Sequence, residues 1–195
     1  MGITFSRRTI GCNPSSEKAN ISDQRMYIQM MGYSDELEAT KGLPDIFELV
    51  KKAVELELGK TRAGLMLGLS ELGGTRSGWI GAYYPVSSNI IVMNKTSLRL
   101  IENTNPSLLK SYSFHILLHE YLHTIGIIDE KKTRLKAVEI SRKLFGPDHP
   151  TTKMAEDITK FFDYIVYPVF GWIPPKQSEL ELVEGFDRSS VTYIT

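Results

Sequence analysis

Residues 119–129 read H-E-Y-L-H-T-I-G-I-I-D, and their first five residues decide how the rest of the chain is interpreted. Residues four apart on a helix lie on the same face, so His119 and His123 can direct two imidazoles at one Zn²⁺ ion. Glu120 lies beside that position, where a zinc-dependent hydrolase has its general base. The motif therefore predicts a helical zinc site with Glu120 as the catalytic residue.

Three residues are candidates for the third metal ligand. Gly126 can end the motif helix in a left-handed conformation, after which the chain turns and Asp129 can return to the metal. His149, in the turn at 146–150, and Glu139, on the following helix, are the alternatives. A zinc-free interpretation also exists, in which Gly126 and Asp129 merely cap two consecutive helices and both motif histidines lie on the surface.

The extended motif H-E-x-x-H-x-x-G-x-x-D resembles that of the metzincin metallopeptidases, whose third ligand is usually His. The snapalysin type has Asp there, as this chain has at Asp129. Residues 122–129 are also similar to the zinc site of the bacterial rRNA-maturation factors, a family that lacks the Glu of the motif. More broadly, the chain resembles uncharacterised archaeal predicted metallopeptidases with an H-E-Y-L-H core.

The metallopeptidase resemblance implies an α+β, zincin-like fold, in which a small mixed β-sheet packs on helices that include the active-site helix. It also implies a peptide or protein substrate. In zincins an edge strand before the motif helix pairs with extended substrate, and residues 89–94 match that strand here. The resemblance further places a methionine beneath the metal, for which Met154 is a candidate, although a core position on the last helix suits Met154 better.

The periodicity of apolar residues divides the chain into three parts. We expect an irregular N-terminal segment at 1–44, a zincin-like metal-binding domain at 45–167 and an extended C-terminal tail at 168–195. Within the domain the pattern predicts helices at 44–58, 96–101, 106–125, 130–145 and 152–162, and strands at 65–69, 79–84 and 89–94. His115 lies one turn before the motif, and we expect it to pack rather than to bind metal.

The composition limits the possible partners. The formal net charge is zero, so nothing in the charge balance favours nucleic acid as a partner. The single cysteine, Cys12, excludes an intrachain disulfide and favours a reducing, cytoplasmic location. We find no apolar run of 18 residues, and so expect no membrane-spanning helix.

The sequence therefore predicts a cytoplasmic zinc metallopeptidase. Two alternatives stay open. One is a non-catalytic zinc protein or binding module that uses the motif as scaffold. The other is a zinc-dependent endoribonuclease of the rRNA-maturation type, which would need a basic cleft.

Overall fold

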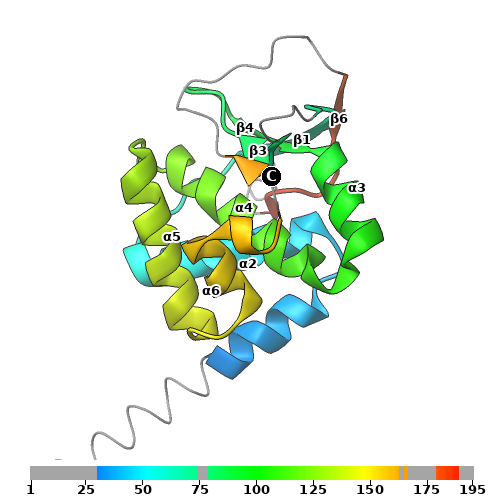
Figure 1. Cartoon of the computed structure of the whole chain (residues 1–195). Helices are drawn as coiled ribbons and strands as arrows, with labels where there is room; N and C mark the ends of the chain where they lie inside the picture. The colour runs from blue at the N-terminus through cyan, green and yellow to red at the C-terminus, as the bar shows by residue number, and fades with distance from the viewer. Residues whose placement is uncertain (1–29, 74–78, 163–164, 167–178, 189–195) are drawn as a thin grey trace, which may run out of the picture.

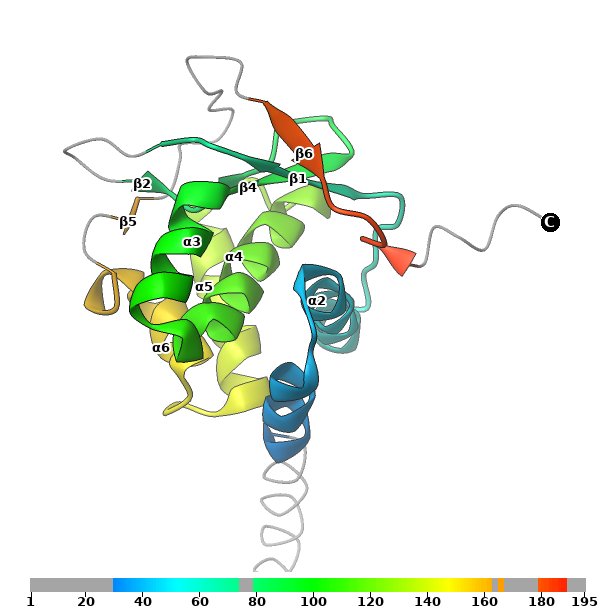
Figure 2. The ribbon, with the colours of Figure 1, turned by 90° about the vertical axis from the view of Figure 1, so that its right-hand side faces the viewer.

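The chain combines a bundle of helices with a small mixed β-sheet, as expected for the α+β class. The computed structural model describes residues 30–73, 79–162, 165–166 and 179–188. The sheet lies along one side of the helices, and α4 runs through the middle of the bundle (Figures 1 and 2). None of the described helices has the length and apolar character needed to cross a membrane.

The helical elements are residues 30–39, α2 (Leu43–Leu58), α3 (Lys95–Thr104), α4 (Leu109–Thr124), α5 (Glu130–Phe145) and α6 (Pro150–Glu156), with short 3₁₀ turns η1 (Pro106–Leu108) and η2 (Ile158–Lys160). The strands are β1 (Met66–Ser70), β2 (Trp79–Ile80), β3 (Ala82–Tyr83), β4 (Ile90–Asn94), β5 (Ile165–Val166) and β6 (Leu180–Leu182). The last predicted helix is shorter than expected, because α6 ends at Glu156 and the 3₁₀ turn η2 follows.

The main sheet has the strand order β3-β4-β1-β6. Strands β1 and β4 are parallel, while β3 and β6 run antiparallel to their neighbours at the two edges. Leu67, Ile91 and Met93 are fully buried and form the face that packs on the helices. The prediction that residues 89–94 form the edge strand is wrong, because β4 lies between β3 and β1. The edge beside β4 is β3.

The predicted strand at 79–84 is interrupted at Gly81, so β2 pairs with β5 and only β3 joins the main sheet. A Cβ atom at Gly81 would lie 2.8 Å from Tyr112 Oη and 2.9 Å from Ile116 Cδ1, both on α4. Only glycine lets the backbone come so close to a helix. This contact brings β3 directly against the motif helix.

Helix α4 is buried on every side, since all residues from Ser111 to Thr124 are buried. It contacts α2, α3, α5 and α6, and its N-terminal half packs beneath β3. A helix that is enclosed all round must be lined by apolar or fully bonded side chains. The histidines and the carboxyl group of the motif therefore lie in the protein core, where each needs a partner.

Both terminal segments contribute to the fold. Residues 30–39 are helical, although 1–44 was expected to be irregular, because Tyr33 and Leu37 pack into the core. In the predicted extended tail, β6 adds to β1 and Phe186 stacks on Phe47 of α2 with ring centroids 4.0 Å apart.

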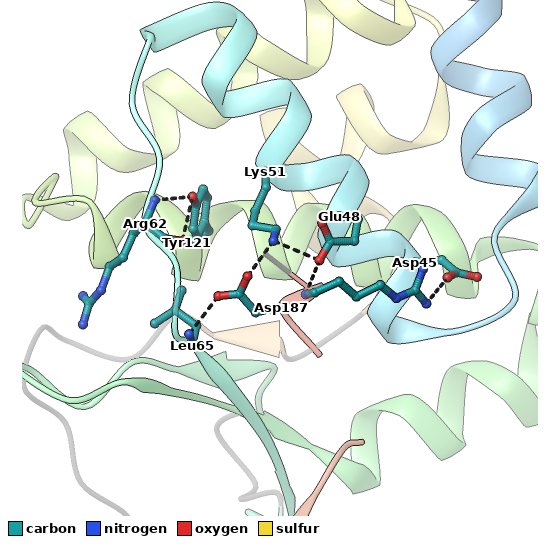
Figure 3. A network of polar contacts seen from close by, with 8 residues as sticks. Asp45, Glu48, Lys51, Arg62, Leu65, Tyr121 and Asp187 are labelled. Carbon is teal, nitrogen blue, oxygen red and sulfur yellow. Dashed lines mark hydrogen bonds and ion pairs between the residues drawn. The ribbon is translucent and has the colours of Figure 1, made fainter. Parts of the chain in front are cut away.

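A buried ion pair fixes the end of this tail segment (Figure 3). Asp187 is fully buried; its Oδ1 lies 2.6 Å from Lys51 Nζ, and its Oδ2 accepts the Leu65 N–H at 2.9 Å. Lys51 also contacts Glu48 at 2.9 Å. This network joins α2, the start of β1 and the C-terminal segment.

Candidate metal centre

The end of α4 has the geometry that the sequence predicts. Gly126 adopts φ +97°, a left-handed conformation that favours glycine. The Gly126 N–H donates to His123 O at 3.1 Å, and the Ile127 N–H donates to Leu122 O at 3.1 Å. This pair of bonds is a Schellman motif. It reverses the chain immediately after the second histidine and directs α5 back along α4.

The start of α5 decides which acidic residue reaches the histidines. Asp129 is the N-cap of α5, and its carboxylate accepts the Lys132 N–H at 2.8 Å. That bond turns the Asp129 side chain toward its own helix. Glu130, the first residue of α5, extends back toward α4 instead. The structure thus places Glu130, and not the predicted third ligand Asp129, with the two histidines as a possible third ligand.

His119, His123 and Glu130 form a compact group of three possible ligands. The two His Nε2 atoms are 3.2 Å apart, and the Glu130 oxygens lie 3.2 Å from His119 Nε2 and 3.1 Å from His123 Nε2. Ligands held at 2.0–2.1 Å around a tetrahedral zinc are about 3.3 Å from one another. The three ligand sites therefore have nearly the spacing that zinc requires, and they can hold a metal ion.

A second set of contacts orients His123. Its Nδ1 lies 2.8 Å from Ile127 O, so an N–H on Nδ1 donates to that carbonyl and leaves the Nε2 lone pair for the metal. The Thr133 hydroxyl also donates to Ile127 O, at 2.9 Å. The turn between α4 and α5 thus supplies Glu130 and also orients one histidine.

Glu120 is buried at 3% exposure beside this group. Burial raises the pKa of its carboxyl group to about 8, and the negative charge of Glu130 acts in the same direction, while His123 and the backbone N–H of Tyr84 lower it. The Tyr84 N–H comes from the residue after β3. The edge strand and the motif helix therefore meet at Glu120.

The three candidate ligand side chains shift one another's pKa values. Burial raises the pKa of Glu130, but the hydrogen bonds from His119 and His123 outweigh it and lower that pKa to about 2. Burial lowers the pKa of His119, whereas the contacts with Glu130 and Glu120 raise the pKa of His123 despite burial.

The structure does not bring the alternative third ligands to the site. The side chain of His149 caps α6 by accepting the Thr151 N–H at 3.2 Å, and its ring stacks on Phe145 at 4.8 Å. Burial lowers the pKa of His149. Glu139 is exposed and pairs with Lys136 at 2.5 Å.

The two remaining candidates are core residues. His115 is buried at 1% exposure, and burial together with the nearby charges of His119 and Arg134 lowers its pKa to about 3. Met154 is fully buried on α6 and belongs to the hydrophobic core. Cys12 lies outside the described residues.

Sequence reasoning missed Glu130 although one signal was present. Two adjacent acidic residues, Asp129 and Glu130, open the helix, and an N-cap uses the first of such a pair. The zinc-free interpretation had already assigned the cap to Asp129. Assigning the cap and the ligand to different residues would have identified Glu130.

Comparison of the chain with protein-family models, with curated proteins and with solved structures found no match. Only the site itself therefore indicates a function.

Proposed function

We propose that the protein is a zinc-dependent metallopeptidase of zincin-like architecture, with His119, His123 and Glu130 as metal ligands and Glu120 as general base. The observation that carries the proposal is the triangle of three possible ligand atoms beside the buried carboxyl group of Glu120, which lies on the helix of the two histidines. Two histidines and one carboxylate are a ligand set of hydrolytic zinc enzymes, which keep a further position open for water or substrate.

Each side chain has a defined part in this chemistry. Zinc supplies a Lewis acid that polarises a carbonyl group and lowers the pKa of a water molecule. Glu120 takes the proton of the attacking water and passes it to the leaving amine. The Tyr84 N–H orients the carboxyl group for both transfers.

Strand β3 offers a place for the substrate. It is an edge strand of the described sheet, and it lies against α4 next to Glu120. An extended peptide can pair with the unused N–H and C=O groups of such an edge. Main-chain pairing of this kind supports a peptide as the substrate class.

A non-catalytic zinc centre is the second candidate, and burial of the site favours it. His119, Glu120 and His123 are all buried, and only Glu130, with 28% of its side chain exposed, is partly open. A closed site of this kind can stabilise the fold without turning over a substrate. Such a centre, however, has no need for the carboxyl group of Glu120.

Glu120→Gln distinguishes the two candidates. The amide keeps the size of the side chain but cannot accept the proton, so this variant should bind zinc like the wild type and lose peptide hydrolysis. The measurements are zinc content by elemental analysis and cleavage of a mixed peptide library, with a structured RNA as comparison substrate. The His119→Ala/His123→Ala double variant is the control that should lose zinc.

Four results are possible, and each favours or rejects one assignment. Zinc bound through the histidines, with cleavage that depends on Glu120, supports the metallopeptidase. Zinc binding without cleavage of any peptide by the wild type supports the non-catalytic centre. Equal cleavage by wild type and Glu120→Gln would show that the assignment of the base is wrong, and cleavage of RNA alone would favour the endoribonuclease.

A further inference from the structure

Arg62 joins three segments around the motif helix. Its Nη1 donates to Thr124 O, in the last turn of α4, and to Tyr84 Oη, both at 2.8 Å. Its Nη2 donates to Ser88 O at 2.6 Å. A guanidinium group presents several donors in a fixed plane, so one side chain can hold all three oxygens. Arg62 therefore ties the end of α4 to the turn between β3 and β4.

The backbone of Arg62 is fixed on the same helix (Figure 3). Its N–H donates to Tyr121 Oη at 2.8 Å, and the Tyr121 hydroxyl lies 3.3 Å from Arg62 O. Tyr121 is fully buried and directly follows Glu120. The position of Arg62 is therefore set by the motif helix rather than by the loop that carries it.

Tyr84 is the link between Arg62 and Glu120. The Arg62 guanidinium lies over the Tyr84 ring at 5.6 Å and donates to its hydroxyl, which in turn donates to Ser88 O at 2.9 Å. The backbone N–H of Tyr84 donates to the Glu120 carboxyl group. One residue thus takes its place from Arg62 through its side chain and holds Glu120 through its main chain.

The other end of β3 is fixed independently. Gly81 packs on Tyr112 and Ile116 of α4, and the Asn94 N–H donates to Gly81 O at 2.9 Å. Asn94 Nδ2 also donates to Ile80 O at 2.9 Å. Because these contacts do not involve Arg62, its loss should release only the Tyr84 end of the strand.

We propose that Arg62 is a positioning residue for the reaction at Glu120: it holds Tyr84 against the end of α4 and so keeps the Tyr84 N–H on the Glu120 carboxyl group. The catalytic part rests on the proposed peptidase function, while the structural part does not. The hydrogen bonds of Arg62 go to Tyr84, Ser88, Tyr121 and Thr124, and not to the three candidate ligand side chains. Its removal should leave metal binding intact.

Arg62→Gln tests the proposal with three measurements. Hydrogen exchange of the Tyr84 amide should become about tenfold faster or more, since the charge-assisted bonds that hold this turn are lost. Zinc affinity should equal that of the wild type. For peptide hydrolysis, kcat should fall on the order of 10²-fold with little change in KM, as expected when a reacting group is misplaced.

Three further variants separate positioning from general stability. Arg62→Lys keeps the charge but cannot bridge three oxygens, so it should recover little of the loss. Tyr84→Phe removes the hydroxyl that accepts from Arg62, and Arg62→Gln should have a smaller effect in that background. Arg142→Gln, which removes an exposed arginine paired with Glu156 on the surface, is the matched control and should change none of the three measurements.

Unchanged exchange of the Tyr84 amide in Arg62→Gln would overturn the proposal. So would a raised KM at constant kcat, or a loss of zinc together with faster exchange along all of α4, since either result assigns Arg62 to substrate binding or to the fold. If the wild type cleaves no peptide, the proposed function fails and the catalytic part fails with it. The exchange and zinc measurements then still decide the structural part.

Discussion

Replacing Glu130 by Gln should abolish tight zinc binding, whereas replacing Asp129 by Asn should not. Both changes remove one negative charge at the start of α5 and keep the size of the side chain. Only Glu130 contacts the histidines, at 3.1 and 3.2 Å. Asp129 caps the helix through the Lys132 N–H, and Asn caps as well as Asp does. The pair of variants therefore isolates the ligand from the cap.

The expected loss of zinc affinity follows from the number of ligands that remain. Loss of an outer partner of a metal ligand costs about 10–100-fold in affinity, so loss of one ligand of three should exceed about 100-fold. Zinc at about 100 times the wild-type Kd stabilises the native state by about 2.7 kcal/mol, and a variant with a 100-fold weaker site gains only about 0.4 kcal/mol. For a chain of 195 residues, zinc should then raise the Tm of the wild type by about 5–11 °C and that of Glu130→Gln by about 1–2 °C.

Thermal unfolding with and without zinc measures this difference, and competition with a chromophoric chelator gives the affinities directly. His149→Ala should behave like the wild type in both assays, because His149 caps α6. Glu130 is not the ligand if Asp129→Asn loses the zinc-dependent rise in Tm while Glu130→Gln keeps it. Loss of zinc in His149→Ala with full retention in Glu130→Gln would refute the assignment equally.

Two further predictions concern the frame around the site. Asp187→Asn should lower the free energy of unfolding by about 2–3 kcal/mol. This is less than the roughly 3–5 kcal/mol of a fully broken buried pair, because Lys51 keeps its contact with Glu48 at 2.9 Å. Glu36→Gln at the exposed Lys52 pair should cost under about 0.5 kcal/mol; urea unfolding measures both variants, and equal costs would show that the buried Lys51–Asp187 pair does not stabilise the fold. Although burial lowers the pKa of Lys51, its carboxylate partners raise it above the usual value, so this stabilisation is fully present below about pH 10.4 and should disappear as the pH rises through the raised pKa. Gly81→Ala should destabilise the fold by about 1–3 kcal/mol, since the new methyl group meets Tyr112 and Ile116. Gly32 is a helical position whose added Cβ would have no atom within 4 Å, so Gly32→Ala should stabilise the fold by up to about 1 kcal/mol. If Gly81→Ala is neutral in the same urea assay, β3 can move away from α4 without cost.

The helices around the site were predictable because their signals are local. Apolar spacing, the cap at Asp129 and the glycines at 126 and 146 set the start and end of α5 at the residues expected. The reversal at Gly126 follows from the same kind of signal. The positions of His119, Glu120 and His123 on one helix could therefore be inferred from the sequence alone.

The sheet was predictable only in part, because strand order depends on contacts between distant segments. The patterns at 65–69 and 89–94 correspond to β1 and β4, but nothing in them says which strand lies at the edge. The close approach of Gly81 to α4 splits the strand before β4. A single glycine in a strand pattern indicates such a close approach, but it does not indicate which element the backbone approaches.

The same contrast between local signals and long-range contacts applies to the residues that position the site. Glu130 is seven residues from His123, so capping rules could have located it. Arg62 and Tyr84 are far from the motif in the sequence, and each has a bland local context. Their bonds to Thr124 O and to Glu120 arise only once the sheet has packed on α4. Sequence patterns thus identify the candidate ligands but not the groups that hold Glu120.

The burial of Glu120 bears most directly on the choice between catalysis and a structural centre. Burying a carboxyl group costs stability even when it is hydrogen-bonded, and an apolar side chain at this position of α4 would pack without that cost. Three ligand atoms are already available from the two histidines and Glu130. A structural site would therefore be more stable with leucine at 120 and would lose no ligand. The carboxyl group, held in place by the Tyr84 N–H, makes chemical sense as a base beside the metal.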